Sequence, residues 1–111
     1  MARLVFVDRA RRDLAQIAAY IERESTERDR AEEFIAKLVA YCERLAALNI
    51  MIGRSRHDIR AMYRSVTFGN YVIFFTYDAV VGDPIAVMKV LHVLWGGRDL
   101  DAYFRGGGDN E

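Results

Sequence analysis

The spacing of apolar residues changes once along this chain of 111 residues, and that change limits the folds it can adopt. Between residues 10 and 48, apolar side chains recur at the period of an amphipathic helix. Between residues 59 and 95, they gather in short runs rich in β-branched and aromatic residues, which are typical of strands. Helices followed by strands predict an α+β domain.

The first half of the chain is expected to form two helices. Asp8 lies where it can cap the first helix. Thr26 and Asp29 have the spacing of a capping box at the start of a second helix, which should end near Leu48. Because only a few polar residues separate the two helices, they should pack as an antiparallel hairpin.

The strands are expected on either side of this hairpin. Residues 3–7 predict one N-terminal strand, and residues 59–67, 70–77 and 84–95 predict a three-stranded antiparallel meander. Apolar residues occupy both faces of the last two segments, so both faces of the sheet should be covered. The residues expected in the core are Leu14, Ile17, Ile21, Phe34, Leu38, Leu45, Val72, Phe74, Val87 and Val90.

The composition fits one small domain. With 52% hydrophobic residues, residues 1–104 should form a single domain with a real core, and the glycine-rich residues 105–111 a disordered tail. The single cysteine, Cys42, cannot form an internal disulfide and is expected to be a small buried residue. Neither a metal site nor a cofactor is expected. No apolar run is long enough to cross a membrane, which favours a cytoplasmic location.

Arginine is concentrated in residues 53–65, although the formal net charge of the chain is zero. Residues 22–33 are acidic by contrast, so the uneven charge could steer a charged partner, while stable direct DNA binding is not expected. If a strand begins at residue 59, alternate side chains point outward with Met62 between them. The arginines that should then form one basic strip are Arg54, Arg56, Arg60 and Arg64. The alternative is a solvated face whose arginines pair with Asp58 and with the acidic hairpin.

The order of several short motifs resembles the ParE branch of the ParE/RelE toxin superfamily, the toxins of bacterial type II toxin-antitoxin pairs. These motifs are the helix pattern "DLAQIAAYI", the loop "GRSR", the strands "YRS" and "NYVIFF", and the closing "GGRDL". The resemblance extends from Asp13 to Phe104. It implies a helical hairpin on a small, twisted antiparallel sheet, which is the fold derived above.

The chain also departs from the pattern of that family. His92 stands where relatives usually have an arginine, and Trp95 stands where they usually have a histidine. The proline that is common before the "GRSR" loop is missing from "NIMIGR". These changes leave the expected fold untouched but bear on activity.

The resemblance implies two functional classes. ParE-like members inhibit DNA gyrase by binding and are neutralised by a ParD-like antitoxin segment that folds on contact, for which the basic strip is the expected landing surface. RelE-like members cut messenger RNA on the ribosome. A ribonuclease here would use Arg60, Arg64, Lys89 and His92. Lys89 and His92 have opposite strand parity, so they should face opposite sides of the sheet unless a bulge intervenes.

Two further interpretations concern the last strand. His92 lies among apolar residues and is expected to be a core histidine rather than an acid or base. Trp95 and Arg98 flank two glycines and are expected to contact the target, whereas in the alternative Trp95 closes the core and Arg98 pairs with Asp99 or Asp101. A third functional class is an inactive orphan that only binds an antitoxin.

Overall fold

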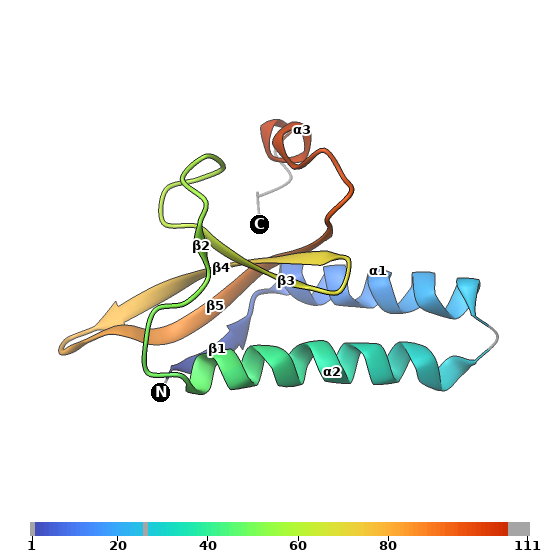
Figure 1. Ribbon diagram of the computed structural model, residues 1–111, viewed down its shortest axis with the longest axis horizontal. Helices are drawn as coiled ribbons and strands as arrows, with labels where there is room; N and C mark the ends of the chain where they lie inside the picture. Colours follow the sequence, from blue (N-terminus) through green and yellow to red (C-terminus); the bar gives the residue numbers. More distant parts are fainter. Residues whose placement is uncertain (1, 26, 107–111) are drawn as a thin grey trace.

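The computed structural model describes residues 2–25 and 27–106 and confirms the α+β class (Figure 1). Helices α1 (Asp8–Glu24) and α2 (Arg28–Ala47) form the antiparallel hairpin. Asp8 is the first residue of α1 and not its cap, because Val7 holds the cap position. Thr26 of the expected capping box lies outside the described residues, as do residues 107–111 of the expected tail.

Five strands form a single sheet in the order β1-β5-β4-β3-β2. Their bounds are β1 Arg3–Phe6, β2 Arg54–Ser55, β3 Arg64–Phe68, β4 Tyr71–Val80 and β5 Asp83–Trp95. The N-terminal strand β1 runs parallel to β5, and the other neighbours are antiparallel. The two-residue strand β2 and the short helix α3 (Leu100–Arg105) were not expected from the sequence.

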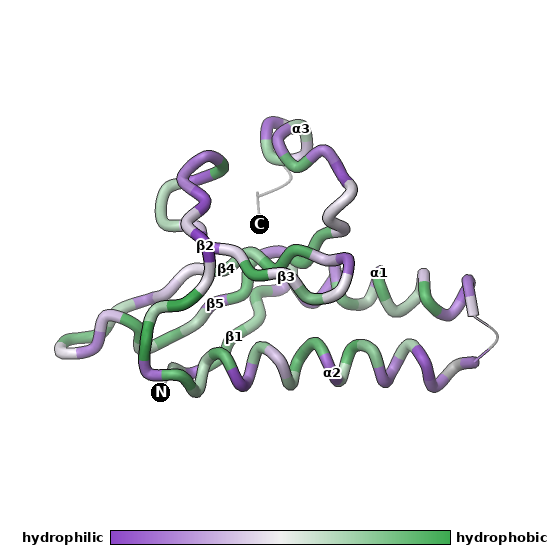
Figure 2. Tube along the Cα trace, in the orientation of Figure 1, coloured by the Kyte–Doolittle hydropathy of each residue, from purple (hydrophilic) through white to green (hydrophobic). Residues whose placement is uncertain are grey.

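Both faces of the sheet are covered, as predicted for its central strands. The helical hairpin packs on one face against Ile73, Phe75 and Val90, and α3 covers the opposite face beside Phe74 (Figure 1). Because successive side chains of a strand point to opposite faces, the run Ile73–Phe75 can supply both clusters. The central strands are accordingly mostly hydrophobic along their length (Figure 2).

Most of the predicted core residues occupy the core. Ile17, Leu38, Phe74 and Val90 are buried, and the half-buried residues that pack against the two clusters are Leu14, Ile21, Phe34, Leu45 and Val72. Val87 is half-buried and belongs to neither cluster, so its core assignment is wrong. Its cross-strand neighbours are the exposed Arg3 and Asp78.

The strand expected at residues 59–67 is shorter than predicted. The backbone amides of Ile59 and Arg60 both donate to the Arg56 carbonyl, at 2.9 and 3.1 Å, so the segment before β3 is a turn. Met62 has φ 70°, in the left-handed region that ends extended structure. The β4–β5 hairpin is longer than predicted, because pairing continues to Val80 and Asp83. No helix in the described part of the chain is long and apolar enough to span a membrane.

A β-bulge in β5 changes which side chains share a face. Phe75 pairs with Val90 and Phe74 pairs with His92, so Leu91 is an extra residue without a cross-strand partner in β4. A bulge shifts strand parity by one residue. Lys89 therefore lies on the same face as His92, which is the exception that the sequence analysis allowed for a bulge.

Candidate functional site

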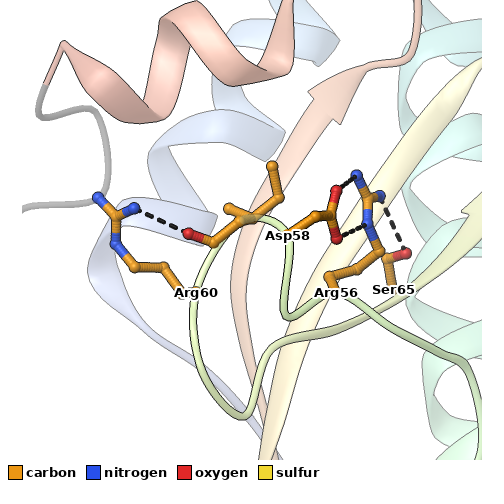
Figure 3. Close-up of polar contacts among 5 residues, drawn as sticks. Arg56, Asp58, Arg60 and Ser65 are labelled. Atoms are coloured by element: carbon orange, nitrogen blue, oxygen red, sulfur yellow. Dashed lines mark hydrogen bonds and ion pairs between the residues drawn. The ribbon is translucent and has the colours of Figure 1, made fainter.

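The arginine-rich segment is built mainly as a structural loop. Arg56 donates from Nε and Nη2 to the two carboxylate oxygens of Asp58, both at 3.1 Å, and from Nη1 to Ser65 Oγ at 3.4 Å (Figure 3). Its guanidinium also lies 5.3 Å from the centre of the Phe74 ring. The hydrogen bonds from Arg56 lower the pKa of Asp58, which keeps that carboxylate charged. Arg56 thus closes the loop onto the sheet.

Arg60 connects the same loop to the C-terminal helix. Its Nη1 donates to the Ile59 carbonyl at 2.9 Å (Figure 3), and its Nη2 donates to the Phe104 carbonyl at 3.3 Å. The guanidinium lies 5.8 Å from the centre of the Phe104 ring. The outward alternation expected for Arg60 and Arg64 is wrong, because Arg60 lies in the turn and only Arg64 lies in β3.

Arg64 holds the segment that enters the loop. Its Nε donates to the Ile52 carbonyl and its Nη2 to the Gly53 carbonyl, both at 2.7 Å. Gly53 has φ 87°, and a Cβ there would lie 2.8 Å from Cζ of Phe75. Glycine is therefore required both by the backbone conformation and by the close approach of the Phe75 ring.

Arg54 differs from the other three arginines. It lies in the edge strand β2 and is exposed. Within the described part of the chain, its guanidinium makes no hydrogen bond or ion pair. Arg54 is consequently the member of the expected basic strip whose donors are available to a partner.

The residues expected of a ribonuclease do not meet at an accessible surface. Lys89 Nζ lies 3.3 Å from Asp78 Oδ2, in an ion pair between neighbouring strands. His92 is only 1% exposed, as the core interpretation expects. The rings that surround it at centroid distances of 5.1 to 6.4 Å are Tyr63, Phe74, Tyr103 and Phe104. A substrate cannot reach His92 while α3 is in place.

Trp95 and Arg98 lie together beside the end of β5. Trp95 is 58% exposed, so it does not close the core. The Arg98 amide donates to the Trp95 carbonyl at 3.2 Å, and the Arg98 guanidinium lies 4.7 Å from the centre of the Tyr103 ring. Among the described residues, Arg98 forms no ion pair with Asp99 or Asp101. Asp99 instead caps α3 by accepting from the Ala102 amide at 3.1 Å.

These two residues line a cleft of about 260 Å³ between α1, the end of β5 and α3, which we call the α1–α3 cleft. Its wall is held by a chain of polar contacts that begins at the buried Asp13, whose Oδ2 accepts from the Val93 amide at 2.9 Å. Arg9 Nε lies 3.5 Å from Asp13 Oδ1, and Arg9 Nη2 donates to the Tyr103 hydroxyl. The cleft therefore combines three segments that are far apart in the sequence.

Sequence reasoning missed most of this cleft. Arg9, Asp13 and Tyr20 lie on one side of α1, and Tyr103 lies in the helix that was not expected. The available signal was Asp13, a carboxylate between apolar positions of the helix stripe, because such a residue needs a buried partner.

Burial raises the pKa of Tyr103, so its hydroxyl stays protonated at neutral pH. No group of three or more potential metal ligands occurs among residues 2–25 and 27–106.

Comparison with known protein families identifies the family of the chain. The family model described as "ParE toxin of type II toxin-antitoxin system, parDE" matches residues 4–100. These residues include both helices of the hairpin, all five strands except the first residue of β1, and both Trp95 and Arg98. No curated protein sequence matches the chain.

Proposed function

Since the chain belongs to the ParE toxin family of type II toxin-antitoxin systems, we propose that it inhibits DNA gyrase by binding and is neutralised by a ParD-like antitoxin. The observation that carries this proposal is the family match over residues 4–100, which spans the hairpin and all of the sheet except Arg3. The proposed site of action is the cytoplasm, where gyrase meets DNA.

The state of the candidate ribonuclease residues supports a binding function over RNA cleavage. General acid-base catalysis requires a side chain within hydrogen-bond reach of the substrate. His92 is buried beneath α3, and Lys89 is paired with Asp78. Arg60 and Arg64 each direct two donors to backbone carbonyls, so these donors are not available to stabilise a phosphorane.

The proposed contact with gyrase consists of Trp95 and Arg98. Tryptophan and arginine are the residue types most enriched at binding hot spots, where they are exposed before binding and desolvated afterwards. Trp95 is more than half exposed, and the Arg98 guanidinium lies 4.7 Å from the centre of the Tyr103 ring without a carboxylate partner in the described structure. An ordered side chain loses less conformational entropy when a partner binds.

The proposed contact with the antitoxin is the arginine-rich loop. Acidic side chains of an antitoxin segment would pair directly with Arg54. They would also contact the loop itself, whose shape is held by Arg56, Arg60 and Arg64. Reversing the charge of Arg54 should weaken the complex and reduce its salt dependence without destabilising the toxin. Unchanged affinity for Arg54→Glu would contradict this contact.

The proposal is tested with the purified protein in gyrase supercoiling and DNA-cleavage assays. The wild type should inhibit supercoiling, and Trp95→Ala and Arg98→Gln should each lose inhibition while retaining native circular dichroism. Arg54→Gln, which removes one exposed arginine elsewhere, is the matched control and should inhibit like the wild type. Cleavage of ribosome-bound messenger RNA without any effect on gyrase would overturn the proposal in favour of a RelE-like activity. Absence of toxicity on induction, together with antitoxin binding, would identify an inactive orphan.

A further inference from the structure

The α1–α3 cleft combines exposed aromatic rings with an available guanidinium. Trp95 and Tyr20 both line the cleft, and they are 58% and 51% exposed. Large aromatic side chains are usually buried in folded proteins, so two of them on the walls of one cleft form a surface suited to a planar ligand. Arg98 lines the same cleft.

The guanidinium of Arg98 is held in place but its donors are not used. The Tyr103 ring supports it at 4.7 Å, and Tyr103 is itself fixed by the hydrogen bond from Arg9. Within the described residues, Arg98 has no carboxylate partner and makes no side-chain hydrogen bond. The N–H groups of a guanidinium form a fork that matches the oxygens of a phosphate, so donors left unused by the protein can bind one.

The indole of Trp95 packs against Gly97. A Cβ on Gly97 would lie 2.5 Å from atoms Cη2 and Cζ2 of the indole, so the ring rests directly against the glycine backbone. Only glycine allows this approach. The outer edge of the six-membered ring of the indole thus lies against the chain, while Trp95 as a whole stays 58% exposed. Such a supported and exposed ring is the platform on which nucleobases stack.

We propose that the α1–α3 cleft binds a nucleotide, with its base stacked on Trp95 and its phosphate accepting hydrogen bonds from Arg98. The cleft volume of about 260 Å³ lies just below the usual range of small-molecule pockets, so the cleft would hold the base and the phosphate while the rest of the nucleotide extends into solvent. That nucleotide can be free or can be the end of a single strand, because both present the same base and phosphate. The inference goes beyond gyrase inhibition, since it requires neither gyrase nor an antitoxin.

The single tryptophan of the chain makes the proposal directly measurable. Trp95 is the only indole that contributes to intrinsic fluorescence, so base stacking in the cleft should quench the emission. Titration of the full-length protein with AMP, corrected for absorbance by the nucleotide, should give saturable quenching. Arg98→Gln, which leaves Trp95 in place, should raise the dissociation constant at least about tenfold. Arg54→Gln loses the same charge at a remote exposed site and should leave the dissociation constant unchanged.

Three other ligands complete the experiment. Ribose 5-phosphate has no base, so it should compete with AMP but should not quench. The second ligand is a short single-stranded RNA, whose concentration is expressed per nucleotide. If the RNA quenches at a lower concentration than AMP does, the natural ligand is a strand. If both quench at the same concentration, the natural ligand is a free nucleotide. Three results overturn the proposal: absence of quenching at about 10 mM AMP, equal AMP binding by wild type and Arg98→Gln, or saturable quenching by an acidic peptide and not by AMP. Gyrase inhibition can persist in each of these cases.

Discussion

Replacing Arg64 and Arg54 in turn by methionine separates structural from exposed arginines within one short segment. Both variants lose a guanidinium and keep an apolar stem, and the two residues lie on adjacent strands. Arg64 donates two hydrogen bonds of 2.7 Å to the carbonyls of Ile52 and Gly53, whereas Arg54 is exposed. The comparison therefore isolates the contribution of those two bonds.

The expected loss for Arg64→Met follows from the environment of each bond. A hydrogen bond from a charged group contributes roughly 1.5 to 3 kcal/mol when partly buried, and the bond to Ile52 is in this class. The bond to Gly53 is exposed and adds about 0.5 kcal/mol. We expect the free energy of unfolding to fall by about 2 kcal/mol for Arg64→Met, and by less than about 0.5 kcal/mol for Arg54→Met.

Urea denaturation followed by circular dichroism measures both changes. With the slope typical of small domains, a loss of about 2 kcal/mol lowers the midpoint by roughly 1 M urea. Hydrogen exchange supplies a local measurement, because the Ile52 amide donates to the Tyr77 hydroxyl at 3.2 Å and should exchange faster in Arg64→Met. If the two variants unfold within about 0.5 kcal/mol of each other, Arg64 does not hold the loop and the structural interpretation of this arginine is refuted.

Three further predictions concern the core, the thiol and the cleft. Leu38→Ala should lower the free energy of unfolding by about 3 to 5 kcal/mol, because Leu38 is fully buried. Leu48→Ala, at an exposed site, should lower it by less than about 0.5 kcal/mol. Equal losses in urea denaturation would contradict the packing of α2. Burial raises the pKa of the Cys42 thiol to about 12, so above pH 9 the unfolded chain loses this proton while the folded chain keeps it. The free energy of unfolding of the wild type should therefore fall relative to that of Cys42→Ala as the pH rises from about 9 towards 12, by at most about 1.4 kcal/mol per pH unit. If the free energies of unfolding of the two proteins change in parallel with pH, the thiol is accessible in the folded protein. Gly97→Ala should displace the indole and shift the emission maximum of Trp95 without lowering the unfolding midpoint by more than about 0.5 M urea, and an unchanged spectrum would show that the ring does not rest on Gly97.

The periodic parts of the fold were predictable, and the parts set by single residues were not. The apolar stripes of α1 and α2 and the two-faced strands β4 and β5 follow from spacing alone, and the structure confirms them. The bulge at Leu91 and the left-handed conformation of Met62 leave no periodic trace. Both are decided by tertiary contacts. The bulge places Lys89 on the face of His92, and the conformation of Met62 separates Arg60, which lies in a turn, from the extended structure of β3.

The candidate site shows the same division. Trp95 and Arg98 could be selected from the sequence because a tryptophan and an arginine beside two glycines are unusual at the end of a strand. Their supports could not, because Arg9 and Tyr103 are separated by 94 positions and meet only when α1 and α3 pack on the same sheet. The pairing of Arg56 with Asp58 was one of the two interpretations of the arginine cluster, and the structure confirms it. The roles of Arg60 and Arg64 were hidden, since a sequence does not show the backbone carbonyls that accept from them.

The parallel pairing of β1 with β5 also has a consequence for the nascent chain. Arg3 pairs with Val87, so β1 must wait until β5, the last strand of the sheet in chain order, has been synthesised before the two can pair. Such distant pairings slow folding, and they keep apolar surface exposed during synthesis. The α1–α3 cleft is completed later still, because Tyr103 follows β5. We therefore expect the proposed contact with gyrase to be complete only after α3 has emerged and docked.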